Sequence, residues 1–233
     1  MTAPIILAVD TSDIDIALQW IDATRESVSV YKLGLEFYLT HGFSGVQKVK
    51  ESTGVEIFLD LKLHDIPNTV AGASRAISAL SPRFLTVHSS GGRAMITAAA
   101  QAVPHIDITA VTILTSLSEE DLFEIGYASN ALESAVALAK MSVQAGAKAI
   151  VCSPLEIEAI RGAVGAQIHI ITPGVRPAGT AGGDDQARTM TPRKAIDSGA
   201  SFVVIGRPIT GAWKDGASAM RSAAKAIADE ILA

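Results

Sequence analysis

The sequence predicts a single-domain (β/α)8 barrel, the TIM-barrel architecture, on three observations. Eight apolar runs with strand character alternate with segments of helical spacing. Strict alternation of this kind is typical of a parallel sheet. Eight such units in 233 residues suit a small barrel, a fold that typically has about 250 residues. An open, doubly wound sheet is the alternative. Length alone would also allow two small domains, but no linker or low-complexity segment divides residues 1–233.

The predicted strands are short runs rich in Val, Ile, Leu and Phe. In chain order they are 5–10, 28–35, the first half of 56–70, 83–89, 106–114, 149–153, 167–172 and 202–206. The predicted helices have apolar residues at helical spacing or are rich in alanine. They are 13–25, 37–51, 69–80, 91–102, 131–145, 155–162, 191–198 and 216–232. Ser12 or Asp13 is expected to cap the first helix, and Ser118–Asp121 to form a cap before the helix at 131–145.

Composition excludes several classes of protein. Apolar residues make up 48% of the chain, enough for one sizeable core. The net charge of −5 and the absence of a basic stripe argue against a nucleic-acid partner. The single cysteine, Cys152, excludes an internal disulfide and favours a cytoplasmic protein. The apolar run 4–9 is too short for a signal-peptide core or a membrane span, so no membrane partner is expected.

Residues 56–70, EIFLDLKLHDIPNTV, contain the most informative pattern. Leucines alternate with Asp60, Lys62 and His64, and this period of two predicts a strand with one aliphatic and one charged face. Asp65 follows directly, and Pro67 begins a turn or the first turn of a helix. Buried charges are costly unless they are paired, so the stretch is either a reactive site or a structural network of ion pairs.

A barrel would bring distant polar residues together, because the functional residues of this fold lie at the C-terminal ends of its strands. Lys32 lies within the apolar run YKLGL, where it needs an acidic partner, and Asp60 on the neighbouring strand is the natural candidate. The residues that fall at or near strand ends are Asp10, Lys32, Asp60, Lys62, Thr115, Ser116, Pro173, Gly206 and Arg207. The sequence therefore predicts one site assembled from several strands.

Residues 60–70, DLKLHDIPNTV, resemble the signature of the orotidine 5′-phosphate decarboxylase family, in its bacterial form. The resemblance covers the whole chain. It includes the acid at the end of the first strand, Asp10, and the stretches YKLGLE at 31–36, VTILTS at 111–116, TPGVRP at 172–177 and VIGRPIT at 204–210. The shorter pattern Asp-x-Lys-x-x-Asp is less specific, because related phosphosugar lyases and decarboxylases with the same barrel share it.

The resemblance implies a carboxy-lyase that converts orotidine 5′-phosphate to UMP, the last step of de novo pyrimidine biosynthesis, without a cofactor or metal. Lys62 would be the proton donor to C6 of the pyrimidine. Asp60 would lie against the departing carboxylate, and Lys32 would hold Asp60 and the ribose hydroxyls. Asp65, with Ile66 and Thr69 beside it, would reach into the partner's site in a homodimer.

The resemblance also implies the remaining substrate contacts. The segment 172–186, rich in glycine and proline, would grip the phosphate after a late strand, as loops of this fold often do. On the phosphate side the matching residues are Pro173, Gly174, Arg176, Gln186, Gly206 and Arg207. Arg176 could instead be a solvated loop charge. Thr115 and Ser116 would meet the pyrimidine ring, although Ser116 also has capping-box spacing with Glu119.

Two other functions compete with this one. A magnesium-dependent lyase or decarboxylase of the same barrel superfamily would act on a sugar phosphate, and a catalytically silent relative would bind a phosphoribosyl group without turnover. The five histidines show no metal-binding spacing such as HxxxH, and no dinucleotide fingerprint is present. His64 and His88 end strands, and could contact the site, contact a dimer face or be structural.

Overall fold

Eight parallel strands form one closed barrel in the computed structural model of the chain, which describes residues 2–177 and 190–233. The strands follow their sequence order around the barrel, and β1 pairs with β8 to close it. Their bounds are β1 (Ala3–Ala8), β2 (Val28–Leu33), β3 (Ile57–Leu63), β4 (Phe84–His88), β5 (Asp107–Val111), β6 (Ala149–Val151), β7 (His169–Thr172) and β8 (Phe202–Ile205). The barrel prediction is confirmed, and the open-sheet alternative is wrong.

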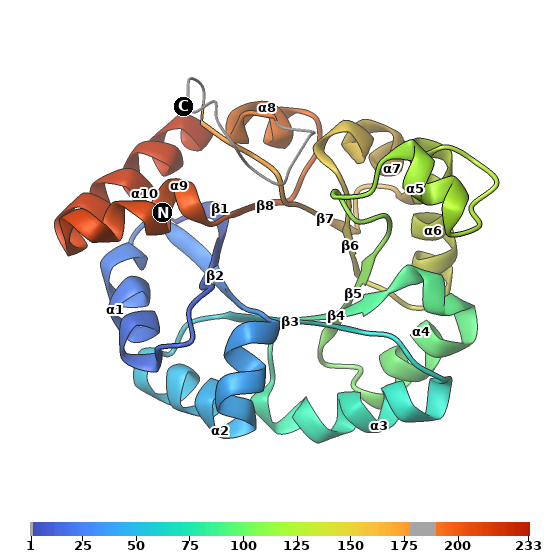
Figure 1. Ribbon diagram of the computed structural model, residues 1–233, viewed down its shortest axis with the longest axis horizontal. Helices are drawn as coiled ribbons and strands as arrows, with labels where there is room; N and C mark the ends of the chain where they lie inside the picture. The colour runs from blue at the N-terminus through green and yellow to red at the C-terminus, as the bar shows by residue number, and fades with distance from the viewer. Residues whose placement is uncertain (1, 178–189) are drawn as a thin grey trace.

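Helices surround the barrel, as the view down its axis shows (Figure 1). They are α1 (Ile14–Thr24), α2 (Leu35–Thr53), α3 (Pro67–Ile77), α4 (Gly92–Ala102), α5 (Glu119–Glu124), α6 (Ala131–Gln144), α7 (Ile157–Val164), α8 (Pro192–Asp197), α9 (Arg207–Thr210) and α10 (Ala217–Leu232). The short helices α5 and α9 were not predicted, because they are too short to show an apolar period. No helix in the described part of the chain is both long and apolar enough to cross a membrane.

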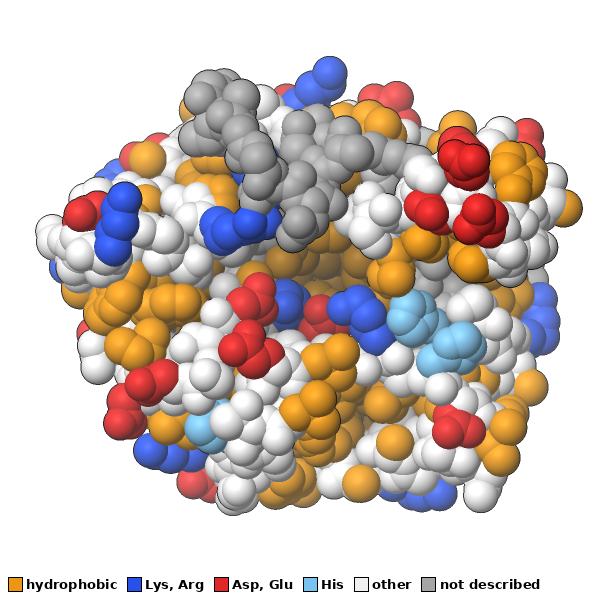
Figure 2. All heavy atoms as spheres, viewed as in Figure 1, with side chains coloured by type: hydrophobic (Ala, Val, Ile, Leu, Met, Phe, Trp, Pro, Cys, Tyr) orange, Lys and Arg blue, Asp and Glu red, His pale blue; other side chains and the backbone are white. Residues whose placement is uncertain are grey.

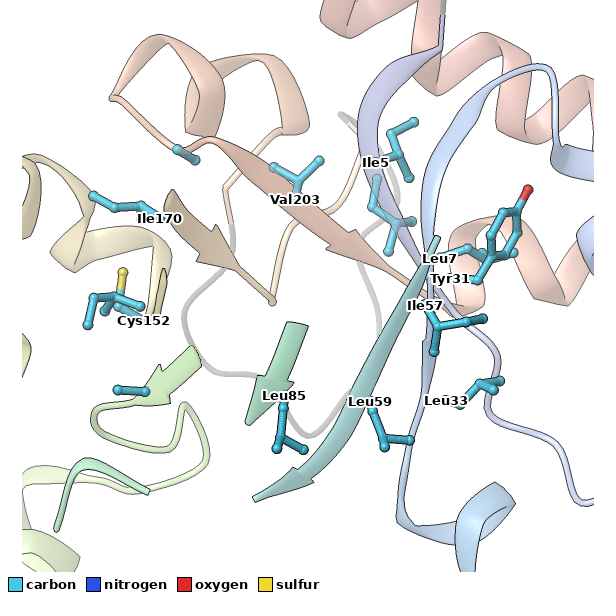
Figure 3. Packing of buried hydrophobic residues seen from close by; sticks show 14 of the residues in the cluster. Ile5, Leu7, Tyr31, Leu33, Ile57, Leu59, Leu85, Cys152, Ile170 and Val203 are labelled. Carbon is cyan, nitrogen blue, oxygen red and sulfur yellow. The ribbon is translucent and has the colours of Figure 1, made fainter. Parts of the chain in front are cut away.

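Alternation along the strands divides the buried side chains into two layers. The larger layer lies between strands and helices, where Leu7, Tyr31, Leu59 and Leu85 point outward from the barrel (Figure 3). The smaller layer fills the barrel itself and consists of Ile6, Val30, Phe58, Phe84, Ala149, Ile171 and Phe202. Polar residues that follow these positions on the same strand faces therefore project toward the open C-terminal end of the barrel.

Local signals explain where the elements around β3 begin and end. Asp13 caps α1, since its side chain accepts hydrogen bonds from the main-chain N–H groups of Asp15 and Ile16. Pro67 occupies the first position of α3, where its missing N–H costs nothing. Gly54 ends α2 with a φ of +67°, a conformation that glycine adopts without strain. The chain thus turns sharply on both sides of β3.

Candidate active site

An irregularity in β3 shapes the site. Leu59 pairs with Leu85 and Leu63 pairs with Val87, so β3 advances four residues where β4 advances two. Within this bulge Lys62 has a φ of +48°, a left-handed conformation that is uncommon for residues other than glycine. Bulges of this kind re-aim side chains beside functional sites. Here the Lys62 ammonium lies over Asp60, with its Nζ 2.9 and 3.0 Å from the two carboxylate oxygens.

Four charged side chains form a row across the mouth of the barrel: Asp10, Lys32, Asp60 and Lys62. Lys32 Nζ lies 3.6 Å from Asp60 Oδ2 and 3.1 Å from Asp10 Oδ1, so the predicted pairing of Lys32 with Asp60 is confirmed. The Asp60 and Lys32 side chains are 11% and 14% exposed, whereas that of Lys62 is 31% exposed. Figure 2 shows acidic and basic side chains alternating across the hollow at the centre of this face. Lys62 is therefore the more accessible of the two partly buried cations.

Asp60 is ionised in this setting. Burial raises the pKa of its carboxyl, but the charges of Lys32 and Lys62 and the hydrogen bonds from Lys62 and Thr86 more than offset this, so the pKa lies below its usual value. An ionised carboxylate keeps both neighbouring ammonium groups paired. The row is consequently a set of fixed charges, all of which are compensated within the site.

A cavity of about 200 Å³ opens beside this row. Its charged side is built by Lys32, Asp60 and Lys62, and the remainder is mostly apolar. Among the described residues, the cavity is lined by Lys32, Phe58, Asp60, Lys62, Val111, Ile113, Leu114, Thr115, Val151, Cys152, Pro173 and Val204. The arrangement suits a small planar group with charge on one edge, held against an apolar wall.

Sequence reasoning missed most of the apolar wall. Phe58, Val111, Val151 and Val204 belong to the inward positions of their strands, so the two-residue period could have identified them. Cys152 also lines the cavity. Burial, together with the nearby charge of Glu156, raises the pKa of its thiol, so Cys152 stays protonated and contributes surface rather than a nucleophile.

The structure separates the two predicted residues after β5. Thr115 lines the cavity, whereas Ser116 is exposed and does not line it. The capping-box interpretation of Ser116 with Glu119 is wrong. Ser118 caps α5 instead, accepting from Asp121 N–H at 3.1 Å while Asp121 accepts from Ser118 N–H at 2.8 Å. The predicted cap at Ser118–Asp121 is therefore confirmed, and it belongs to α5.

Asp65 does not join the charged row of its own chain. Its carboxylate accepts a hydrogen bond from the Ile66 N–H at 2.6 Å, and both residues are exposed. They line a second, open hollow of about 560 Å³ together with His64, Pro67, Ser90 and Gly91. Thr69 is exposed in the first turn of α3. The His64 ring also packs against the His88 ring, with centroids 5.5 Å apart.

The predicted phosphate side is described in part. Pro173 lines the cavity, and the Arg176 N–H donates to the Met190 carbonyl at 2.9 Å. Gly206 precedes α9, and Arg207 is its first residue, with an exposed side chain. Gln186 lies outside the described residues. In the described part of the chain, no group of three or more His, Cys, Asp or Glu side chains could hold a metal ion.

Comparisons with known proteins find relatives that match nearly the whole chain. Residues 3–223 match the family model described as orotidine 5′-phosphate decarboxylase / HUMPS family. Orotidine 5′-phosphate decarboxylase of Thermobifida fusca is 49% identical over 97% of this chain and 96% of its own. The enzyme of the same name from Moorella thermoacetica is 46% identical over 97% and 91%. A crystal structure of orotidine 5′-phosphate decarboxylase from Lactobacillus acidophilus superposes with a TM-score of 0.84 at 33% identity, covering 99% of this chain and 100% of that one.

Proposed function

We propose a mechanism for this chain from one premise: it belongs to the orotidine 5′-phosphate decarboxylase / HUMPS family. It catalyses the decarboxylation of orotidine 5′-phosphate to UMP in pyrimidine biosynthesis. The observation that carries the proposed mechanism is the Lys62 ammonium, held over Asp60 at the wall of a cavity that suits a planar base. We assign the proton transfer to Lys62, because it is the more exposed of the two partly buried cations in the row.

Breaking the bond between C6 and the carboxylate releases CO2 and leaves an electron pair on C6. The ammonium of Lys62 stabilises this developing negative charge and then gives a proton to C6. Lys62 becomes neutral in that step and recovers its proton from water after UMP leaves. The apolar wall opposite the charges keeps water away, which strengthens the interaction between ammonium and carbanion.

Asp60 and Lys32 prepare this step. Asp60 is ionised, so it repels the carboxylate of the substrate until CO2 departs, and it keeps the Lys62 ammonium in place. Lys32 pairs with Asp60 on one side and with Asp10 on the other. We assign to it the binding of the ribose hydroxyls. In this assignment Asp10 and Lys32 both bind the sugar, while Thr115, which lines the cavity, faces the pyrimidine.

The phosphate is bound by Arg207, with Arg176, Gln186, Pro173 and Gly206 around it. Arginine can hold a phosphate through two parallel charge-assisted hydrogen bonds, and such bonds stabilise a complex by about 1.5–3 kcal/mol. Arg207→Ala should therefore lower kcat/KM for orotidine 5′-phosphate about 10- to 100-fold, chiefly through a higher KM. Steady-state kinetics at several salt concentrations would measure this loss.

The matched control for Arg207 is Arg221→Ala, which removes an exposed arginine from α10. This variant should leave kcat/KM within about twofold of the unmodified enzyme, because rim charges away from the substrate act only through screened, long-range fields. Equal losses in the two variants would mean that Arg207 acts through overall charge and does not bind the phosphate.

The active unit is a homodimer in which Asp65, Ile66 and Thr69 enter the site of the partner. Two features support this. Asp65 stands apart from the charged row of its own chain, and Ile66 is a large apolar residue that is 67% exposed.

We place the enzyme in the cytoplasm, in keeping with a lone buried cysteine that forms no disulfide.

A single assay separates this function from the two alternatives. Orotidine 5′-phosphate is mixed with the enzyme, and the loss of its absorbance is followed with and without EDTA. Turnover that continues unchanged in EDTA is expected, because the Lys62 ammonium supplies the positive charge at C6. No turnover of orotidine 5′-phosphate, together with turnover of a sugar phosphate that EDTA abolishes and magnesium restores, would identify a metal-dependent enzyme of the same barrel superfamily. Ligand binding without turnover would identify a silent phosphoribosyl-binding protein.

A further inference from the structure

Thr86 on β4 joins the two halves of the β3 bulge. Its Oγ1 lies 2.9 Å from Asp60 Oδ1 and 2.8 Å from the main-chain nitrogen of Lys62. The residue is fully buried, with no exposed surface. The Thr86 hydroxyl therefore contacts both the Asp60 carboxylate and the backbone of Lys62, whose ammonium is the more accessible of the two in the row.

The directions of these two hydrogen bonds follow from chemistry. The Lys62 N–H can only donate, so Thr86 Oγ1 accepts from it. The single hydroxyl proton is then free to be donated to Asp60, which accepts because it is ionised. The result is a directed chain from the Lys62 N–H through the Thr86 hydroxyl to the Asp60 carboxylate.

The bulge creates the need for such a partner. The regular β3–β4 pairing is interrupted between Leu59 and Leu63, so Lys62 has no place in the regular ladder. Its φ of +48° is unfavourable for a side chain with a Cβ, and such conformations persist only where the surroundings hold them. Threonine is well suited to this task, since its β-branched side chain has few rotamers and keeps its hydroxyl in one place.

We propose that Thr86 is a positioning residue for decarboxylation, whose hydroxyl fixes the Asp60 carboxylate and the Lys62 backbone as one rigid unit. This inference rests on the roles assigned above to Lys62 and Asp60. Thr86 does not line the cavity and so acts through its neighbours. Its removal leaves the substrate contacts intact but allows the ammonium to move away from C6.

The neighbouring strand offers a matched control. Thr109 on β5 pairs with Thr86 in the barrel register and is also fully buried. Its hydroxyl donates to the carbonyl of Asp107 in its own strand, 3.0 Å away, and no hydrogen bond links it to Asp60 or Lys62. Thr109→Val therefore removes the same group at the same level of the barrel without touching the charged row.

The test compares Thr86→Val, Thr86→Ser and Thr109→Val in steady-state kinetics with orotidine 5′-phosphate, alongside thermal unfolding. A displacement of about 1 Å in a catalytic group costs about 10²-fold, so Thr86→Val should lower kcat about 10- to 100-fold while KM changes less than about threefold. Thr86→Ser keeps the hydroxyl and should stay within about threefold of the unmodified enzyme, as should Thr109→Val.

The pH profile gives a readout that a merely structural role would not change. Thr86→Val removes a hydrogen bond to the charged form of Asp60, so the pKa of that carboxyl rises. The acid limb of kcat/KM should therefore move to higher pH in Thr86→Val and remain in place in Thr86→Ser and Thr109→Val. An unshifted limb in a folded Thr86→Val variant would overturn the proposal.

Other results of the same kinetic measurements also test the positioning role of Thr86. A folded Thr86→Val variant with unchanged kcat, a Thr86→Ser variant as impaired as Thr86→Val, or a Thr109→Val variant with the same loss would each overturn the proposal. If Thr86→Val does not fold, Thr86→Ala removes the same oxygen without placing a methyl group against the carboxylate. Failure of both to fold would show that the hydroxyl serves folding and would also overturn it.

The proposed mechanism and the inference fail in distinguishable ways. Lys62→Ala is measured in the same assay. Full activity in Lys62→Ala would remove the assigned role of that residue, whatever Thr86 does. An inactive Lys62→Ala beside a fully active, folded Thr86→Val would leave the assigned role standing and would exclude only the positioning role of Thr86.

Discussion

Replacing Lys62 with alanine should lower kcat for orotidine 5′-phosphate by about 10⁴-fold. Two contributions disappear together in this variant. A charged donor aimed at a developing anion is worth about 10²–10³-fold, and delivery of the proton a further 10²–10⁴-fold, so about 10⁴ is a conservative combination. Absorbance loss at high enzyme concentration would measure the residual rate.

Binding should change much less than turnover in Lys62→Ala. The interaction that is lost forms chiefly as charge develops on C6, so the ground-state complex keeps its phosphate and ribose contacts. The affinity for UMP, measured by calorimetry, should stay within about tenfold of the unmodified enzyme. Loss of UMP binding in parallel with kcat would mean that Lys62 holds the substrate and does not act on C6.

Lys148→Ala is the matched control for this substitution. Lys148 also forms an ion pair with an aspartate, Asp107, at 3.3 Å, but it precedes β6 and so lies at the opposite end of the barrel from the charged row. Its removal should leave kcat within about twofold, because exposed ion pairs contribute little and do not reach the site. If Lys62→Ala keeps near-native turnover, Lys62 is not the proton donor.

The sequence predicted the fold and the centre of the site for identifiable reasons. The two-residue period around Asp60 and Lys62 placed both side chains on one face of a strand, and the apolar surroundings of Lys32 required an acidic partner. The structure shows both features. These predictions succeeded because they depend on local periodicity and on the cost of an unpaired buried charge, which are properties of short stretches of chain.

The parts that could not be predicted depend on more than one strand. The positive φ of Lys62 arises from the register of β3 against β4, which no local pattern reveals. Thr86 looks like an ordinary strand residue until that register places its hydroxyl beside Asp60. The choice between Ser116 and Ser118 as the helix cap could not be made from the sequence either. Both are candidates by spacing, and only the actual start of α5 selects Ser118 as the cap.

Mixing two inactive variants should restore activity if Asp65 serves the partner's site. Lys62→Ala and Asp65→Ala each damage every site of their own homodimer. If Asp65 serves the partner's site, each site takes Lys62 from one chain and Asp65 from the other. In a mixed dimer one site therefore lacks both residues, and the other site has both. With random pairing, half of the dimers are mixed, so about one quarter of all sites should be active.

The measurement is turnover after the two variants are coexpressed or unfolded and refolded together, compared with each variant treated alone. Lys62→Ala mixed with Asp60→Ala is the decisive control. Asp60 and Lys62 lie 2.9 Å apart in the same charged row, so every site of that mixed dimer lacks one of them. This mixture should remain inactive at any ratio.

The contrast between the two mixtures tests the arrangement of residues and not merely the presence of a dimer. Recovery only with Asp65→Ala would mean that the segment from Asp60 to Asp65 contributes to two active sites, with β3 serving one and the exposed turn before α3 the other. Absence of recovery in both mixtures would assign Asp65 to its own chain's site or to none. Recovery in both would show that the variants regain activity by another route, and would leave the exposed Ile66 without this explanation.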